Sequence, residues 1–499
     1  MIEEKKGDVI PRGMKIFCNH LYIGYRTYLP YLYMSIKTKK YKNGLQLLHQ
    51  TSLHSLPLCS IYVFCNVGSS NEKDQLRGIA HFLEHMVFQS SKYKSSTKLY
   101  KQYDKMGTQI NAFTTKRYTC FYAKCSEKYG KEILNLFSHM LYDTDFSKKR
   151  LIKERHIIRE ENLRVQNNFQ ERAEEAFESK IYQHSSFEEP VDHIRFQEVQ
   201  EDMDYNEMIR WYKWFYVPSN MIISVVSRHN LNHWDSLLQS TDFIKNITPK
   251  EKPQQFHDKP ITYPYDSTIE YITTKEPGSI NTQLIIGFRT VNHYSDKQYI
   301  FDLLTHVING MSGRLFKILR QDTNLVYNAN AVTEHSEFTG YFSIQTECKN
   351  ENVMRNHSTG TKKGVIYWII NILQDLAKKG ITSEELLIGK ERLRSYLSIE
   401  SENMSTLCKS NGEKFLLYVQ ESNEATHHKM KQVVPYMELY DTYYKNITLE
   451  QMNNTIREYF RLKNMVVSVI SKSPPDKSKL KQVCEKHFKI NRRTRKKKL

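Results

Sequence analysis

Apolar positions along the chain follow two spacings, and each spacing predicts a different kind of element. Between residues 79 and 87 the apolar side chains recur at i, i+3, i+4, i+7 and i+8, the period of one buried helix face. The same spacing returns between residues 300 and 308. Runs of β-branched and aromatic residues are typical of buried strands. Such runs lie at 59–68, 119–123, 221–226 and 282–288.

The order strand, helix, strand pair occurs twice along the chain. In the first half the strand pair is predicted around 111–114 and 119–123, and a helix follows near 130–142. In the second half residues 328–333 and 340–344 repeat the strand pair. This repetition predicts an α+β fold with two homologous domains, each a mainly antiparallel sheet packed with helices.

The domain boundaries follow from changes in composition. Residues 245–266 are polar and interrupted by prolines, which predicts a linker. We therefore expect a first domain over 44–244 and a second over 267–483. Residues 1–43 are expected to form a basic N-terminal extension, and 484–499 a basic tail.

The charge and the cysteines exclude several classes of function. The chain has 73 Lys and Arg against 55 Asp and Glu, a formal net charge of +18 that is spread over its whole length. No nucleic-acid-binding motif accompanies this charge, so we expect no nucleic-acid partner. The apolar runs are much shorter than the roughly 20 residues of a membrane span. The eight cysteines have no metal-binding spacing and are expected to be free thiols in a reducing compartment.

The strongest chemical signal is the segment His81-Phe82-Leu83-Glu84-His85. On a helix, positions i, i+3 and i+4 share one face, so both histidines and the glutamate point into the same space. Two such imidazoles can chelate one zinc ion, and the carboxylate between them can act as general base towards a water molecule. A surface helix with three polar residues is the alternative. The apolar neighbours count against it, because they would bury this helix and leave its titratable groups in need of a metal.

A catalytic zinc site needs a third protein ligand and keeps one position open. A helix predicted over 148–179 offers Glu154, Glu160 and Glu161. Glu154 and Glu161 are seven residues apart and share a face, whereas Glu160 does not. Helix phase therefore favours Glu161 as the third ligand of one Zn²⁺ per chain. Glu154 is expected to support catalysis by orienting a histidine.

Several segments resemble the pitrilysin-type inverted zinc peptidases. The HxxEH segment is followed after 75 residues by Glu161, and residues 155–161 are similar to the family's R-x-V-I-x-x-E segment. Residues 107–114 resemble its G-x-x-x-N-A-x-T strand, which implies that Asn111 holds the substrate backbone. Arg320 and Tyr327 resemble the family's Arg–Tyr pair that grips substrate. Because relatives use the second domain of the facing subunit, this pair would serve the partner's site.

Within the family, the chain is most similar to the catalytic beta subunit of mitochondrial processing peptidase and its bacterial relatives. This resemblance implies an endopeptidase that cleaves presequence-like peptides in an enclosed chamber, with Glu171 and Glu175 reading a basic residue near the cut. It implies half of a clamshell, completed by a second copy or by a homologous noncatalytic subunit. The implied location is the matrix of a mitochondrion or related organelle, and the alternative is a bacterial cytoplasm.

Other functions remain open at this point. A generic oligopeptide-degrading zinc peptidase would need no basic residue in its substrate, and Glu171 and Glu175 would then be charges on a solvated helix. A noncatalytic structural subunit, like the core proteins of the cytochrome bc complex, shares the fold implied by the resemblance. Such proteins lose part of the metal set, whereas here the set is complete, which favours the peptidase.

Overall fold

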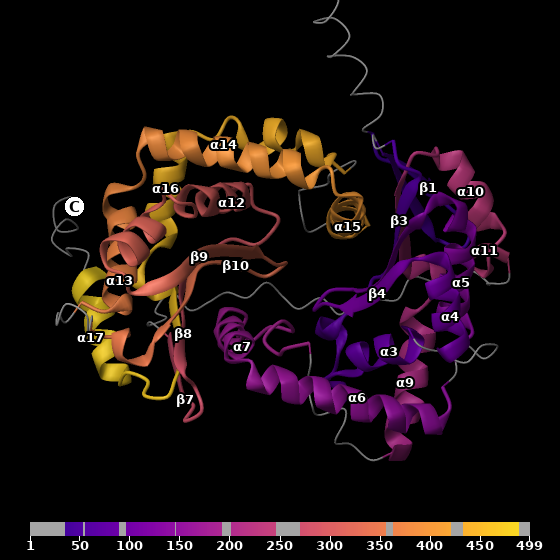
Figure 1. Ribbon diagram of the computed structural model, residues 1–499, viewed down its shortest axis with the longest axis horizontal. Helices are drawn as coiled ribbons and strands as arrows, with labels where there is room; N and C mark the ends of the chain where they lie inside the picture. The colour runs from indigo at the N-terminus through magenta and orange to yellow at the C-terminus, as the bar shows by residue number, and fades with distance from the viewer. Residues whose placement is uncertain are drawn as a thin grey trace, which may run out of the picture.

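The computed structural model describes residues 35–52, 55–88, 96–144, 146–191, 201–245, 270–355, 363–420 and 433–488. Within these ranges the chain forms two sheets with helices around each, and the two domains lie side by side (Figure 1). Apart from Lys245, the expected linker lies outside the described residues. No helix in the described ranges has the length and apolarity to cross a membrane.

The first sheet has the strand order β1-β2-β6-β3-β5-β4. Its strands are β1 (Lys37–Lys40), β2 (Gln46–Thr51), β3 (Leu58–Cys65), β4 (Gln109–Thr114), β5 (Thr119–Ser126) and β6 (Met221–Ser227). Only β2 and β6 pair in parallel; every other neighbouring pair is antiparallel. β4 ends the sheet in the described part of the chain, so one edge of this strand is left without a neighbour.

The second sheet has the order β7-β11-β8-β10-β9. Its strands are β7 (Glu270–Lys275), β8 (Asn281–Arg289), β9 (Val326–His335), β10 (Gly340–Lys349) and β11 (Met465–Ser471). In this sheet the first and last strands in sequence, β7 and β11, pair in parallel and the rest are antiparallel. If β1 is left out and the strands of each sheet are numbered in sequence order, both sheets have the strand order 1-5-2-4-3. The predicted α+β fold with two homologous, mainly antiparallel domains is confirmed.

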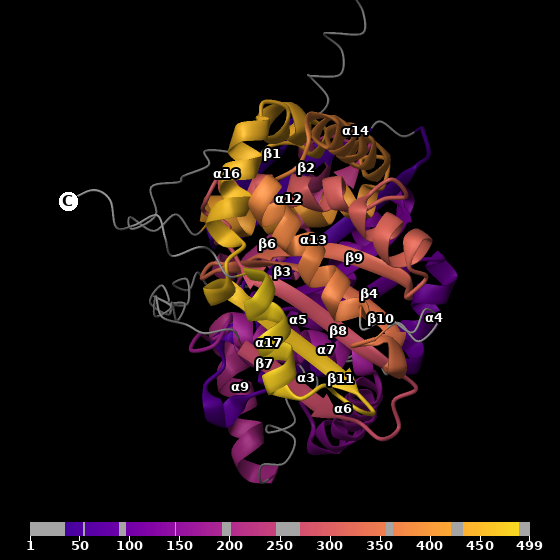
Figure 2. The same ribbon diagram turned by 90° about the vertical axis from the view of Figure 1, so that its left-hand side faces the viewer.

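Helices cover both sheets, and one helix from each half crosses to the other domain. The first half contains α3 (Ile79–Phe88), α4 (Ser96–Met106), α5 (Gly130–Tyr142), α6 (Lys148–Asn167), α7 (Phe169–Ile181), α9 (Glu201–Phe215), α10 (Leu231–Gln239) and α11 (Asp242–Lys245). The second half contains α12 (Lys297–Ile308), α13 (Val365–Lys379), α14 (Ser383–Glu400), α15 (Met404–Lys414), α16 (Leu449–Tyr459) and α17 (Lys477–Phe488). In Figure 2 the second domain faces the viewer, with α13 and α17 in front of its sheet.

The alternation of side chains along each central strand explains this crossing. On β8, Leu284 and Ile286 face the helices of their own domain, whereas Ile285 packs with Phe177 of α7. On β3, Phe64 likewise faces away from its own helices and packs with Leu407 of α15. Each sheet therefore buries its second face under a helix that comes from the other half of the sequence.

Elements of the structure differ from three of the expected boundaries. β1 lies within the expected extension over 1–43 and pairs with β2, so the first domain begins before Gly44. α17 continues past residue 483, because its buried Phe488 packs into the second core, so the tail begins later than expected. The helix predicted over 148–179 is two helices, since Asn168 accepts hydrogen bonds from two backbone amides of α7 and starts a new helix there.

Candidate metal centre

The helix α3 is held firmly in place by its apolar face and by a buried cap. Five of its apolar side chains, Ile79, Phe82, Leu83, Met86 and Val87, are each no more than 1% exposed. At its start the Glu72 carboxylate accepts hydrogen bonds from the backbone N–H groups of Gly78 and Ala80, both at 2.8 Å. Burial raises the pKa of Glu72 to about 8, although these two hydrogen bonds act in the opposite direction. Glu72 was not predicted, because it lies seven residues before the start of α3 and reaches the helix across the turn Asp74–Leu76.

Three ligand atoms converge between α3 and α6. The Nε2 atoms of His81 and His85 are 3.2 Å apart. Glu161 Oε2 lies 3.3 Å from His85 Nε2 and 3.8 Å from His81 Nε2. A tetrahedral zinc ion with ligands at about 2.0–2.1 Å places neighbouring ligand atoms about 3.3 Å apart. The residues therefore fit the donor set and the spacing of a zinc site.

The two neighbouring glutamates differ sharply in position. Glu154 is 1% exposed, and its Oε2 lies 3.7 Å from Nδ1 of His85, the ring nitrogen turned away from the cluster. Glu160 is exposed and does not belong to the cluster. The structure thus brings Glu161 and Glu154 to the histidines and leaves Glu160 on the surface, as their helix phase predicts.

The electrostatics of the cluster favour a positive charge between its side chains. Burial of His85 disfavours its charged form, but the contacts with Glu154 and Glu161 outweigh burial and raise the pKa of His85 to about 10. The carboxylates therefore favour a positive charge beside them. A bound metal cation would supply the same positive charge to the same carboxylates.

Glu84 lies beside the cluster and is held by the end of β4. The side chain is buried, and this burial raises the pKa of Glu84, although His81, His85 and Thr114 act against it. Thr114 Oγ1 donates a hydrogen bond of 2.9 Å to Glu84 Oε2. Thr114 is the last residue of β4, which packs against α3. Sequence reasoning did not single it out, because this contact depends on how the strand is placed against the helix.

The predicted substrate-binding residues are spread over both domains. Asn111 is exposed on β4, and its side-chain oxygen accepts the N–H of Ala112. Arg320 comes from the π-helical segment η5 (Phe316–Asp322), and its guanidinium carbon lies 4.7 Å from the ring centre of Tyr327 on β9. The Tyr327 side chain is 83% exposed. Arg320 and Tyr327 therefore form a stacked pair on the second domain, whereas the histidine cluster belongs to the first.

Glu171 and Glu175 lie on α7 and not on the helix that carries Glu161. Glu171 accepts a hydrogen bond of 2.7 Å from the Asn168 side chain. Glu171, Glu175 and Glu178 form one stripe of α7 at helical spacing. At the end of this stripe Glu178 accepts a hydrogen bond of 2.9 Å from Lys116 in the first domain and one of 3.2 Å from Tyr341 in the second. The break at Asn168 thus changes the predicted geometry, and this end of the stripe lies between the two domains.

The fold and this cluster together define a class of protein, the two-domain inverted zinc peptidases. Residues 50–192 match the family model "Insulinase (Peptidase family M16)", and residues 202–393 match "Peptidase M16 inactive domain". The first match lies within the first domain, and the second runs from the end of the first domain into α14 of the second. The chain belongs to the M16 peptidase family.

Individual relatives and solved structures agree with this assignment. The chain is 25% identical over 386 residues to "Uncharacterized zinc protease YmxG" of Bacillus subtilis, a match that covers 77% of this chain and 88% of that protein. It is 22% identical to an "Uncharacterized zinc protease" of Rickettsia felis, over 76% of this chain and 87% of the relative.

Among solved structures, a protease from Helicobacter pylori superimposes with a TM-score of 0.75 at 18% identity, covering 88% of this chain and 99% of that one. The periplasmic protease PqqL of Escherichia coli has a TM-score of 0.72 at 14% identity, covering 91% of this chain and 50% of PqqL. At this sequence identity, these structural similarities are evidence for the fold alone. The relatives named here are all bacterial and support the family, without pointing to its mitochondrial branch.

Proposed function

We propose that the chain is a zinc metalloendopeptidase that hydrolyses extended peptides. The observation that carries this proposal is the convergence of His81, His85 and Glu161 at the spacing of zinc ligands, with the buried Glu84 beside them. The zinc-protease names of the bacterial relatives support it. The complete donor set counts against a noncatalytic subunit.

Each residue of the cluster has a separate task in hydrolysis. His81, His85 and Glu161 hold one zinc ion, which when bound supplies Lewis-acid activation of water and of the peptide carbonyl. Glu84 accepts the proton of the attacking water and returns it to the leaving amine. Burial raises the pKa of Glu84, which favours its uptake of a proton, and Thr114 fixes its carboxylate. Glu154 orients the ring of His85 from the opposite side.

The edge strand β4 offers a place for the substrate. Its free edge can pair with an extended peptide, which would add a strand to the sheet next to α3. Asn111 is exposed on this strand and would bind the peptide backbone. Arg320 and Tyr327 lie on the second domain, and they would hold the peptide in the site of a facing subunit, in a homodimer or a heterodimer.

A finer proposal concerns the substrate class. Presequence-like peptides carry arginine or lysine, and Glu171 and Glu175 provide carboxylates on the α7 stripe, whose end lies between the two domains. Bidentate pairing of a carboxylate with arginine would select such peptides. A generic oligopeptide-degrading activity is the alternative and would show no preference for a basic residue. A mitochondrial location belongs to the presequence proposal, whereas the bacterial relatives fit the alternative of a bacterial cytoplasm.

Metal removal and replacement test the proposed function. Purified protein should contain about one zinc per chain, since three protein ligands make one catalytic site. A chelator should abolish peptide hydrolysis, and stoichiometric zinc should restore it. His81→Ala should lose both metal and activity. The matched control is His139→Ala, because His139, Asp143 and Asp242 form the other group of possible ligands in the described residues. Retention of zinc and activity by His81→Ala, or their loss in His139→Ala, would place the metal elsewhere.

A further inference from the structure

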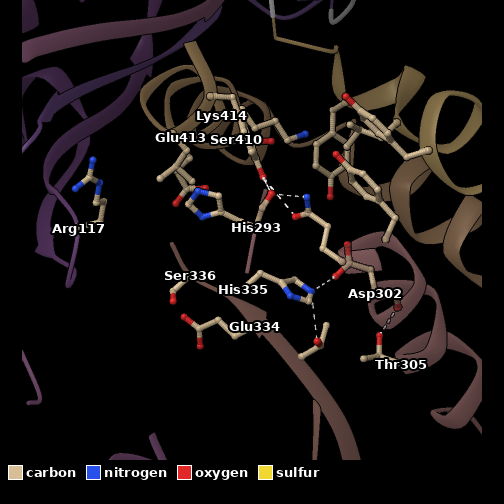
Figure 3. A pocket seen from close by; sticks show the side chains of 18 of the residues that line it. Arg117, His293, Asp302, Thr305, Glu334, His335, Ser336, Ser410, Glu413 and Lys414 are labelled. Atoms are coloured by element: carbon tan, nitrogen blue, oxygen red, sulfur yellow. Dashed lines mark hydrogen bonds and ion pairs between the residues drawn. The ribbon is translucent and has the colours of Figure 1, made fainter. Parts of the chain in front are cut away.

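A separate cavity of about 680 Å³ lies where the two domains meet (Figure 3). Its walls come from the turn between β4 and β5, from the end of α15 with the π-helical segment η7 (Phe415–Gln420) and from α12. Leucine and tyrosine side chains supply much of its surface, for example Leu393, Leu417, Tyr299 and Tyr443. This volume is in the range of pockets that bind small molecules. π-helical turns are also frequent at functional sites.

Lys414 brings a buried ammonium group into this cavity. It is the last residue of α15, and in Figure 3 it enters the space between Arg117 on one side and Asp302 on the other. Its Nζ is buried and has no hydrogen-bond partner among the described residues; the centre of the Tyr436 ring lies 5.5 Å away. Burial lowers the pKa of Lys414 to about 8, although Glu413 and Asp302 act in the opposite direction. A buried ammonium group that makes no hydrogen bond is costly, so the cavity favours a ligand that accepts hydrogen bonds from it, such as an anion.

The acidic groups near Lys414 already have other partners. Asp302 lies 3.2 Å from His335 Nε2 and accepts the hydroxyl of Tyr444 at 2.9 Å. Glu413 accepts the hydroxyl of Tyr118. These carboxylates are therefore engaged before any ligand arrives.

The remaining charges of the cavity are balanced as well. Arg117 Nε pairs with Glu337 at 2.8 Å, and both side chains are buried. Burial raises the pKa of Glu334, which disfavours its charged form. Burial also lowers the pKa of His293 to about 3, so its ring is neutral, and its Nε2 has no hydrogen-bond partner in the described ranges. Lys414 Nζ and His293 Nε2 are therefore left without hydrogen-bond partners among the described residues and can bind a ligand.

We propose that this cavity binds a small amphipathic monocarboxylate, whose carboxylate pairs with Lys414 and whose apolar body lies against the leucine and tyrosine walls. His293 Nε2 supplies a second polar contact. The same chemistry is offered by a free carboxylic acid and by the C-terminal carboxylate of a short peptide. A doubly charged phosphate fits less well, because the other buried cation, Arg117, is paired with Glu337.

The cavity is connected to the catalytic glutamate through one turn. Thr115 and Tyr118 line the cavity, and the turn between them is closed by hydrogen bonds from Thr115 N and Oγ1 to Tyr118 O at 2.8 and 2.9 Å. The preceding residue, Thr114, donates to Glu84. A ligand that fills the cavity therefore acts on the strand end that positions Glu84. This second step rests on the proposed function, whereas the binding step does not.

Calorimetry on the zinc-loaded Glu84→Gln protein tests binding without turnover. The probes are 4-phenylbutyrate and N-acetyl-leucyl-phenylalanine, each with its neutral amide. Each acid should bind at least tenfold more tightly than its amide, because a hydrogen bond to a charged group contributes more than one to a neutral group. Lys414→Met should remove this difference. Lys409→Met is the matched control, since Lys409 is a half-exposed lysine of the same helix that pairs with Glu413, and it should preserve the difference.

Each outcome tests either ligand binding in the cavity or its coupling to Glu84. Equal affinities of acids and amides, or an unchanged difference in a Lys414→Met protein with normal thermal unfolding, would overturn the binding site. The more tightly bound acid identifies the source of the carboxylate. In the active enzyme a saturating acid should change kcat at least twofold, and Lys414→Met should be insensitive to it. An unchanged kcat at saturation would overturn the coupling. Failure of the proposed function would appear differently, as absent hydrolysis without any ligand.

Discussion

The two domains have the same strand order, but they use the corresponding helix in different ways. α3 and α12 share the same apolar spacing, which aligns Ile79 with Ile300 and Val87 with Ile308. In this alignment the positions of His81, Glu84 and His85 in α3 are occupied in α12 by Asp302, Thr305 and His306. In both domains the last residue of a strand also contacts this helix. Thr114 at the end of β4 bonds Glu84, and His335 at the end of β9 contacts Asp302.

This difference shows how one scaffold can present either a metal site or a small-molecule cavity. In the first domain the polar helix face meets two carboxylates of α6, and the cluster favours a cation. In the second domain Asp302, Thr305 and His306 line the cavity that contains Lys414, and the cavity favours an anion. Both groups of possible metal ligands in the described residues lie in the first domain. The scaffold supplies the facing helix and strand end, and a few side chains set the sign of the charge that is bound.

The sharpest test of the comparison is a pair of substitutions at corresponding positions. Glu84→Gln should lower kcat about 10²- to 10⁴-fold, the usual contribution of a general base, and should retain zinc because Glu84 is not a ligand. Thr305→Ala should leave kcat within about twofold, since no reacting group lies there in the proposed mechanism. Steady-state peptide hydrolysis and metal analysis measure both effects. Full activity in Glu84→Gln, or a comparable loss in Thr305→Ala, would break the assignment of chemistry to the first domain.

A second test concerns the helices that cross between domains. Phe177 on α7 is 1% exposed and packs on the second sheet, so Phe177→Ala should cost about 3–5 kcal/mol of unfolding free energy. Hydrogen exchange should then increase in β8 and β11, although α7 belongs to the first half of the sequence. Leu163→Ala on the exposed face of α6 is the control and should change stability by less than about 0.5 kcal/mol. Faster exchange confined to the first sheet would contradict the crossing arrangement.

A third test separates two adjacent glutamates. Glu161→Gln should weaken zinc binding by more than about 100-fold, because it removes a direct ligand, whereas loss of an outer group such as Glu154 should cost about 10- to 100-fold. Glu160→Gln should leave zinc affinity unchanged, since this side chain is exposed. Competition with a fluorescent zinc chelator measures all three values. If Glu160→Gln loses zinc and Glu161→Gln keeps it, the phase of α6 is different from the one described here.

Local patterns predicted much of the fold and most of the side-chain cluster between α3 and α6. The helix expected over 130–142 is α5 with the same bounds, because its apolar spacing and its flanking residues are local signals. The cluster of His81, His85 and Glu161 also follows from spacing, since two helix faces and their phase determine which side chains can meet. Whether the faces of α3 and α6 meet depends on the fold.

Features set by contacts distant in sequence could not be predicted. Nothing near α7 indicates that Ala173 O accepts a hydrogen bond from Ser468 at 3.1 Å, which helps to place α7 on the other sheet. The edge strand β1 is short and charged and was included in the expected extension. Thr114 and Lys414 gain their roles only where strand, turn and helix meet. The hydrophobic pattern of one segment carries no information on its contacts with segments distant in sequence.

The smallest effect is expected for substrate selection by the stripe on α7. If Glu171 and Glu175 line the peptide path, they should favour peptides with arginine before the cut by roughly ten- to a hundredfold in kcat/KM, the value of a charge-assisted contact. Replacing both with glutamine should flatten the preference between arginine and alanine peptides and leave zinc content unchanged. Glu160→Gln serves as the control for loss of surface charge. The net charge of +18 opposes long-range attraction of a basic peptide, so a preference that survives at high salt must come from local contacts. Equal cleavage of both peptides by the wild-type protein would exclude presequence selection and favour a generic oligopeptide-degrading role.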